Sequence, residues 1–102
     1  MTKERFLEKM DLIVKMAESK GCVKTSRGPN SYEIGKVSFD IFENNSLNLR
    51  LRNLVIFIDI QDIEHFDFTF RSTRSFVPKE INIYLRFENG GNDINIESLK
   101  IK

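Results

Sequence analysis

A chain of 102 residues has room for one domain with a modest core, so we expect residues 1–102 to fold as a single unit. Its 16 basic and 15 acidic residues nearly cancel, which argues against the basic excess typical of nucleic-acid and membrane binders. Cys22 is the single cysteine, and no apolar run approaches the ~20 residues of a membrane span. We therefore expect a cytoplasmic protein with no internal disulfide and no membrane partner.

The N-terminal segment predicts one helix over residues 2–20. Thr2 can cap its first turn, and Gly21 follows it at the position of a left-handed C-cap. Apolar residues recur along one side at helical spacing, namely Phe6, Leu7, Met10, Ile13, Val14 and Ala17. We expect this stripe to face the core, although a helix that docks onto a partner would show the same pattern.

After Gly21 the apolar period changes from helical to alternating, which indicates strands. Residues 22–27 predict a short extended piece, and a turn is expected at residues 28–30. Residues 32–42 predict a strand with a bulge at Gly35, where the apolar parity changes. A further strand is predicted at residues 47–51.

Residues 54–60, LVIFIDI, are apolar on both parities, which is typical of a strand covered on both faces. We expect this strand to be central, with Ile56 and Ile58 fully buried and with the helix covering Val55 and Phe57. Arg52 and Asn53 must form a bulge, a bend or a tight turn before it. One strand over residues 47–60 would extend roughly 46 Å at ~3.3 Å per residue, too long for this domain.

Three more strands are predicted at residues 66–71, 81–87 and 94–102. The segment NGGND at residues 89–93 is typical of a hairpin turn, and the last strand shifts parity near Glu97. Short connections between neighbouring strands favour antiparallel pairing. The sequence thus predicts an α+β fold in which the N-terminal helix packs on one face of a mainly antiparallel meander of about six strands.

The histidine His65 is the one candidate for chemistry, because Asp59, Asp62, Glu64 and Asp67 surround it in the sequence. One imidazole and one thiol are too few for a zinc centre, so we expect no metal and no cofactor. The parity of residues 66–70 places His65 on the polar face, where a solvated side chain is expected. Acid–base catalysis by His65 with Asp67 is the enzyme alternative, and it ranks third. Cys22 is expected to be structural.

The connection at residues 71–79 combines arginines, hydroxyls and an aromatic residue, a combination common at protein interfaces. Its candidate partner-binding residues are Arg71, Arg74, Phe76 and Lys79. A second set could form a basic face for single-stranded nucleic acid, namely Arg50, Arg52, Tyr84 and Arg86.

No phosphate loop, dinucleotide fingerprint or nucleophile elbow occurs, and no motif identifies a family. We expect a non-enzymatic protein-binding module or inhibitor that contacts a protein partner. An immunity-type protein or a phage-encoded blocker of a host or defence enzyme would fit this size. Nucleic-acid binding is the alternative, and a homo-oligomer is left open.

Overall fold

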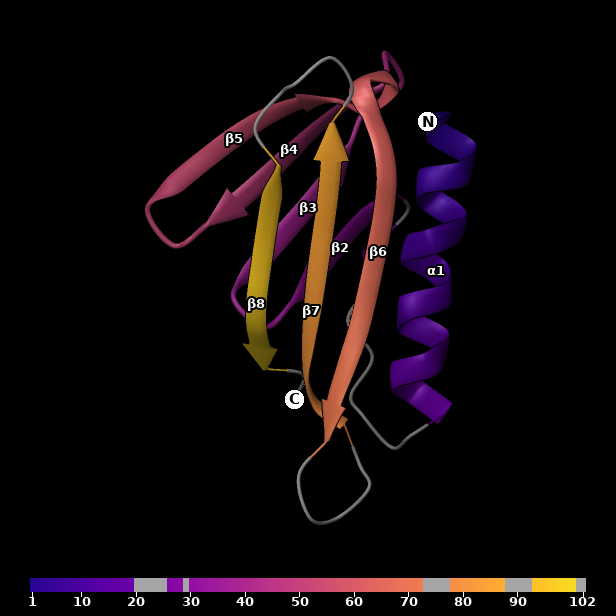
Figure 1. Ribbon diagram of the computed structural model, residues 1–102. Helices are drawn as coiled ribbons and strands as arrows, with labels where there is room; N and C mark the ends of the chain where they lie inside the picture. Colours follow the sequence, from indigo (N-terminus) through magenta and orange to yellow (C-terminus); the bar gives the residue numbers. More distant parts are fainter. Residues whose placement is uncertain (20–25, 29, 73–77, 88–92, 101–102) are drawn as a thin grey trace.

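Figure 1 shows a computed structural model of the chain, which describes residues 1–19, 26–28, 30–72, 78–87 and 93–100. One N-terminal helix accompanies antiparallel strands, so the predicted α+β class is confirmed. The strands form two sheets instead of one meander, with the orders β1-β2-β3-β4-β5 and β6-β7-β8. Cys22, Gly21 and the turn at residues 89–93, apart from Asp93, lie outside the described residues.

The helix α1 spans Lys3–Ser19, close to the predicted bounds. Thr2 caps it as predicted, because its Oγ1 accepts a hydrogen bond of 3.2 Å from the backbone N–H of Arg5. The apolar stripe faces the core, with these residues buried: Phe6, Met10, Ile13 and Val14. The core interpretation of the stripe is therefore confirmed for these four residues.

The five-stranded sheet is a series of antiparallel hairpins. Its strands are β1 (Ser26–Gly28), β2 (Ser31–Ile34), β3 (Val37–Ile41), β4 (Ser46–Leu51) and β5 (Leu54–Asp59). The bulge predicted at Gly35 is wrong, because Gly35 and Lys36 form a turn between β2 and β3, with Ile34 paired to Val37. Gly35 has a φ of 60°, which glycine adopts without a steric penalty. The Arg52–Asn53 connection is a tight turn, one of the three alternatives.

The three-stranded sheet follows a short 3-10 helix, η1 (Ile60–Asp62). Its strands are β6 (Ile63–Ser72), β7 (Pro78–Phe87) and β8 (Ile94–Lys100). β6 and β7 are longer than predicted, so the connection between them narrows to residues 73–77. The register of β8 shifts between Ile96 and Leu99, which confirms the parity change expected near Glu97.

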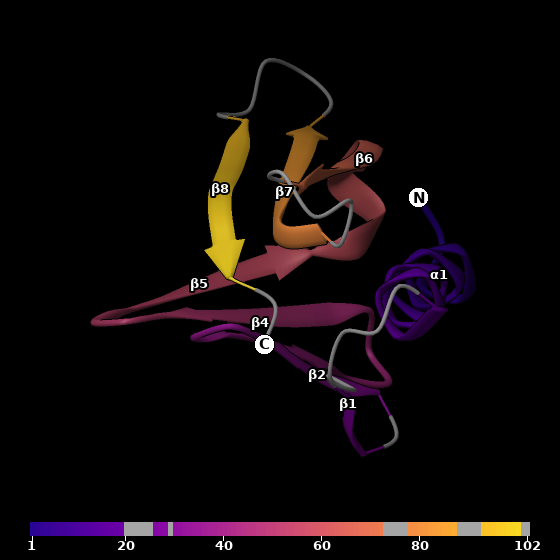
Figure 2. The same ribbon diagram turned by 90° about the horizontal axis from the view of Figure 1, so that it is seen from below.

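The inner faces of both sheets and the stripe of α1 meet in one hydrophobic cluster. Figure 2 shows α1 along one side of the molecule, next to β6. Phe6 on α1 packs on Phe66 of β6, with ring centroids 4.9 Å apart. On the other side of α1, the Tyr32 hydroxyl of β2 donates a hydrogen bond of 2.6 Å to Asp11. The helix therefore joins the two sheets.

The prediction that residues 54–60 form a central strand is wrong. β5 is the last strand of its sheet, and among the described residues it pairs with β4 alone. Ile58 is 7% exposed and therefore buried as predicted, but Ile56 is only partly buried. Val55 and Phe57 are exposed. They lie on the face of β5 that points away from the core, whereas α1 contacts β6 and β2 on the core side.

No helix in the described part of the chain combines the length and the apolar character needed to cross a membrane.

Candidate protein-binding surface

The β4–β5 hairpin carries the candidate surface, and Figure 1 shows it projecting past β8, with its tip on the side away from α1. The hairpin consists of two short strands that flank Arg52–Asn53, whose turn pairs Leu51 with Leu54. Its tip extends beyond the sheet-to-sheet core. Apolar side chains near the tip are therefore more exposed than the apolar side chains of the strands that face the core.

Three apolar residues of β5 are exposed to solvent: Leu54 (57%), Val55 (38%) and Phe57 (77%). We call them the β5 edge strip. An aromatic side chain so fully exposed leaves a large apolar area in water, and contiguous apolar exposure is typical of interaction sites. Val55 and Phe57 lie on the outer face of β5, whereas Leu54 lies on the other face beside the turn, so apolar side chains are exposed on both faces of this edge strand.

The backbone of β5 adds hydrogen-bonding groups to this apolar strip. In a two-residue hairpin the pair next to the turn exchanges hydrogen bonds, so Leu54, Ile56 and Ile58 direct their N–H and C=O groups toward β4. Ile60 continues this alternation, since its N–H donates to the carbonyl of Asn45 over 2.9 Å. Val55 and Phe57 therefore direct their N–H and C=O groups, and Asp59 directs its N–H, toward the edge of β5 opposite β4, where no described strand pairs.

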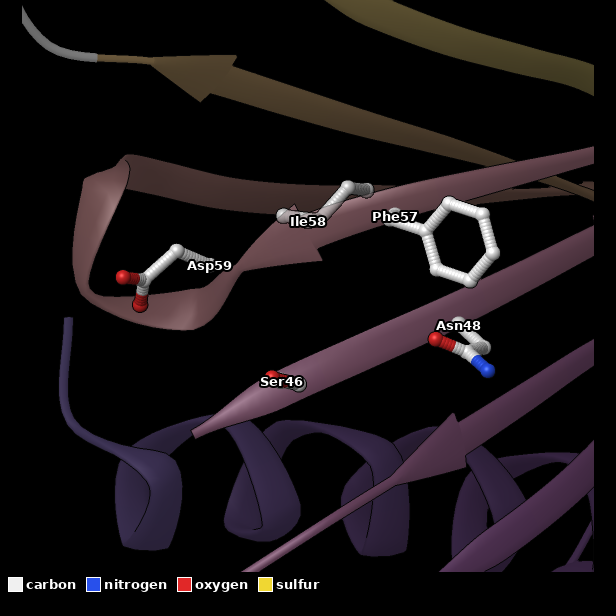
Figure 3. A pocket seen from close by; sticks show the side chains of 5 residues that line it. All are labelled: Ser46, Asn48, Phe57, Ile58 and Asp59. Atoms are coloured by element: carbon white, nitrogen blue, oxygen red, sulfur yellow. The ribbon is translucent and has the colours of Figure 1, made fainter. Parts of the chain in front are cut away.

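An open depression lies beside the strip, with a volume of about 240 Å³. It is lined by Ser46, Asn48, Phe57, Ile58 and Asp59 (Figure 3). Phe57 and Asn48 face each other across β4 and β5 in register, with an apolar ring beside an amide. This surface offers an apolar contact flanked by hydrogen-bonding groups, which is the usual composition of a protein interface.

The rest of the outer face of this sheet is polar. Asp40 accepts a hydrogen bond of 2.7 Å from the Ser31 hydroxyl, and its other oxygen lies 3.8 Å from Nε of Arg50. Because Arg50 is well exposed, water screens this ion pair and its contribution to stability is small. The apolar character of the outer face is therefore concentrated at β5.

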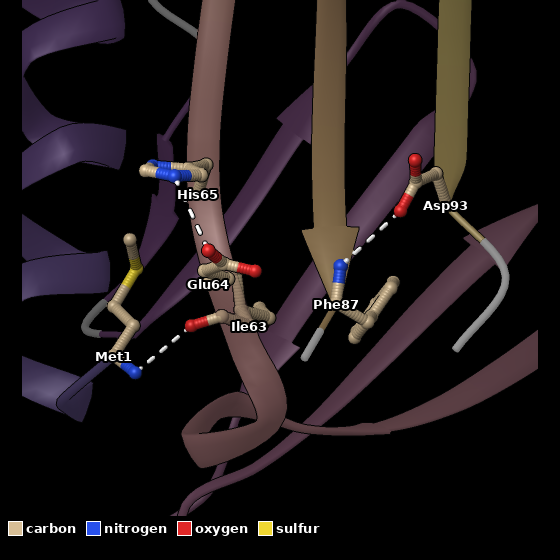
Figure 4. Close-up of polar contacts among 6 residues, drawn as sticks. All are labelled: Met1, Ile63, Glu64, His65, Phe87 and Asp93. Atoms are coloured by element: carbon tan, nitrogen blue, oxygen red, sulfur yellow. Dashed lines mark hydrogen bonds and ion pairs between the residues drawn. The ribbon is translucent and has the colours of Figure 1, made fainter. Parts of the chain in front are cut away.

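His65 lies exposed on the outer face of β6, as predicted, with its Nε2 3.6 Å from an Oε1 of Glu64 (Figure 4). Asp59 has a structural contact, because its Oδ1 accepts from the N–H of Gln61 over 3.0 Å and caps η1. Within the described ranges, no three His, Cys, Asp or Glu residues gather as they would around a metal ion.

Figure 4 also shows how the start of α1 is joined to β6. The amino group of Met1 donates a hydrogen bond of 2.9 Å to the carbonyl of Ile63. At the far edge of the same sheet, Asp93 accepts a hydrogen bond of 3.3 Å from the N–H of Phe87. The polar contacts in this region therefore join elements of the fold.

The structure describes part of the predicted partner-binding set. Arg71 is exposed on β6 and pairs in register with Glu80 of β7, while Lys79 lies within β7. Arg74 and Phe76 lie outside the described residues. The set predicted for nucleic acid is divided, because Arg50 and Arg52 belong to β4 and its turn, whereas Tyr84 and Arg86 lie on β7 of the other sheet.

Comparison with family models, curated proteins and solved structures gave no match. Sequence reasoning missed the β5 edge strip, although its signal was present in the apolar residues at both parities of residues 54–58. That pattern is also expected of a central strand, and only the strand order distinguishes the two cases.

Proposed function

We propose that this chain is a non-enzymatic protein-binding module of the cytoplasm, and that its partner docks at the free edge of β5. The observation that carries the proposal is the exposure of Leu54, Val55 and Phe57 on an edge strand. Such a strand combines apolar anchors with backbone donors and acceptors that no other described strand pairs. A partner segment in extended conformation can satisfy both at once by adding a strand to the sheet.

The sequence of β5 supports this proposal. Edge strands that stay unpaired are commonly protected by lysine, proline, a bulge or a covering element. β5, LVIFID, contains neither lysine nor proline, pairs with β4 without a register shift and has its one charge at its last residue. An edge without these protections is expected when a partner covers it.

Inhibition by surface contact is one form that this function could take. A module of this kind blocks an enzyme by occupying its surface, as we expect of an immunity-type or phage-encoded protein. The connection at residues 71–79 remains the competing contact surface for the same function, since Arg71 at its start is exposed.

Partner capture from the source cell, followed by hydrogen exchange on the complex, tests the docking surface. We expect the amides of Val55, Phe57 and Asp59 to exchange rapidly in the free monomer and slowly in the complex, because they point away from β4. The amides of Ile56 and Ile58 already face β4 and serve as internal controls. Unchanged exchange at the three outward amides would show that the partner docks elsewhere.

Two variants locate the contact. Phe57→Lys should abolish capture, while Phe42→Lys, at a residue 47% exposed in the β3–β4 turn, should not. Arg74→Glu combined with Phe76→Ser tests the connection, and capture should survive it. Circular dichroism checks that each variant is folded. Loss of capture with the connection variant alone would move the interface to residues 71–79.

A further inference from the structure

We infer that the strand added at β5 is β5 of a second copy of this chain, so that the protein is a homodimer joined edge to edge. This inference rests on the proposed function, because it names the occupant of the same site. Two antiparallel strands related by a two-fold axis present the same surface to each other. A strand can pair with itself in this way only if each residue is compatible with the residue that the two-fold axis places opposite it.

The outward backbone groups restrict the register. Val55, Phe57 and Asp59 carry these groups, so hydrogen-bonded pairs must join odd-numbered residues of the two copies. With Ile56 on the two-fold axis, Val55 lies opposite Phe57 of the second copy and Leu54 lies opposite Ile58. Every cross-strand pair over residues 54–58 is then apolar on both sides.

The neighbouring registers match less well. An axis at Phe57 would place Val55 opposite the carboxylate of Asp59. An axis at Val55 would place Phe57 opposite Asn53 in the turn. Of these three registers, only the axis at Ile56 places an apolar residue opposite each of Leu54, Val55 and Phe57.

The charges at the ends of β5 favour the same arrangement. Arg52 precedes the strand and Asp59 ends it, and both are exposed. In the register centred on Ile56, Asp59 lies opposite Asn53 of the second copy, directly beside Arg52. The antiparallel dimer therefore brings opposite charges together at both ends, whereas parallel pairing would bring like charges together.

The dimer would join the two five-stranded sheets into one continuous sheet. Val55 and Phe57 of both copies would form one apolar cluster on its outer face, flanked by the polar residues of β4. Both apolar edges would be covered, which explains why β5 lacks the usual protections of an edge strand.

Light scattering over a range of concentrations should give twice the chain mass of 12.0 kDa. Phe57→Lys places a charge opposite Val55 of the second copy and should yield a monomer, while the control Phe42→Lys should remain a dimer. Arg52→Glu alone, or Asp59→Lys alone, should weaken dimerisation roughly tenfold or more, since each puts like charges together. The double variant should recover most of the loss. Asp59→Lys also removes the N-cap of η1. Thermal unfolding measures this loss of stability separately from the change in dimerisation.

Disulfide trapping tests the register. In a Cys22→Ser background, Ile56→Cys should oxidise to a covalent dimer, because residues on the axis at a non-hydrogen-bonded position have Cα atoms about 4.5 Å apart. Phe57→Cys is the matched control and should crosslink poorly. Efficient crosslinking at Phe57 instead of Ile56 would overturn the register, and a dimer unaffected by Phe57→Lys would overturn the interface.

The dimer inference and the proposed function fail separately. If the protein is a monomer at every concentration while Phe57→Lys still abolishes capture of another protein, the second copy is the wrong occupant and the binding edge is correct. If Phe57→Lys changes neither assembly nor capture, both are wrong.

Discussion

The hydroxyl of Tyr32 is held by one hydrogen bond at the edge of an apolar core, where it donates to Asp11 of α1 over 2.6 Å. Tyr32→Phe removes this bond and leaves Asp11 to be solvated, because that carboxylate is exposed. We expect a loss of about 1 kcal/mol in the free energy of unfolding, measured by urea denaturation. Tyr84→Phe, at a half-buried tyrosine on the outer face of β7, is the control and should change it less.

The same tyrosine predicts a pH dependence. Burial raises the pKa of Tyr32 well above its ordinary range, and the hydrogen bond and charge of Asp11 raise it further. Above pH ~10 the unfolded chain releases the phenol proton while the folded chain keeps it, so the stabilisation is complete below that pH and declines above it. We expect the free energy of unfolding to fall more steeply above pH ~10 in the wild type than in Tyr32→Phe. Parallel slopes would contradict this.

Within β5, neighbouring residues have opposite environments, and this alternation can be measured. Ile58 faces the core and Phe57 faces solvent. Ile58→Ala should lower the free energy of unfolding by about 2–5 kcal/mol, because it leaves a cavity in the core. Phe57→Ala should change it by less than about 0.5 kcal/mol at concentrations where the protein is monomeric. A larger effect for Phe57→Ala than for Ile58→Ala would mean that the strand faces the other way.

For the whole molecule, α1 is the element that joins two sheets with separate hydrogen-bond ladders. Phe6 is fully buried against Phe66, so Phe6→Ala should cost about 3–5 kcal/mol. Leu12→Ala, on the exposed side of the same helix, should cost less than about 0.5 kcal/mol. Equal losses would indicate that α1 contributes through its helix propensity and not through its contact with β6.

Local pattern and turn chemistry determined most of the elements of this protein. The period of the apolar residues identified α1, the alternating strands and the parity shift of β8, and the residue type at position 2 identified the cap, because these features depend on neighbours along the chain. The Gly35–Lys36 turn was misinterpreted as a bulge. A tight turn and a β-bulge can both change the apolar parity at a glycine, and the sequence pattern alone does not distinguish them.

Only the tertiary structure decided the order of the strands, and with it the candidate site. A strand that is apolar at both parities can lie in the centre of a sheet, under cover on two sides, or at an edge that a partner covers. Residues 54–58 have the same sequence in either case. The division into two sheets leaves β5 at an edge, and α1 packs against β6 and β2, so Val55 and Phe57 remain exposed. Whether a strand face is covered depends on elements that are distant in sequence, so a local sequence pattern does not predict it.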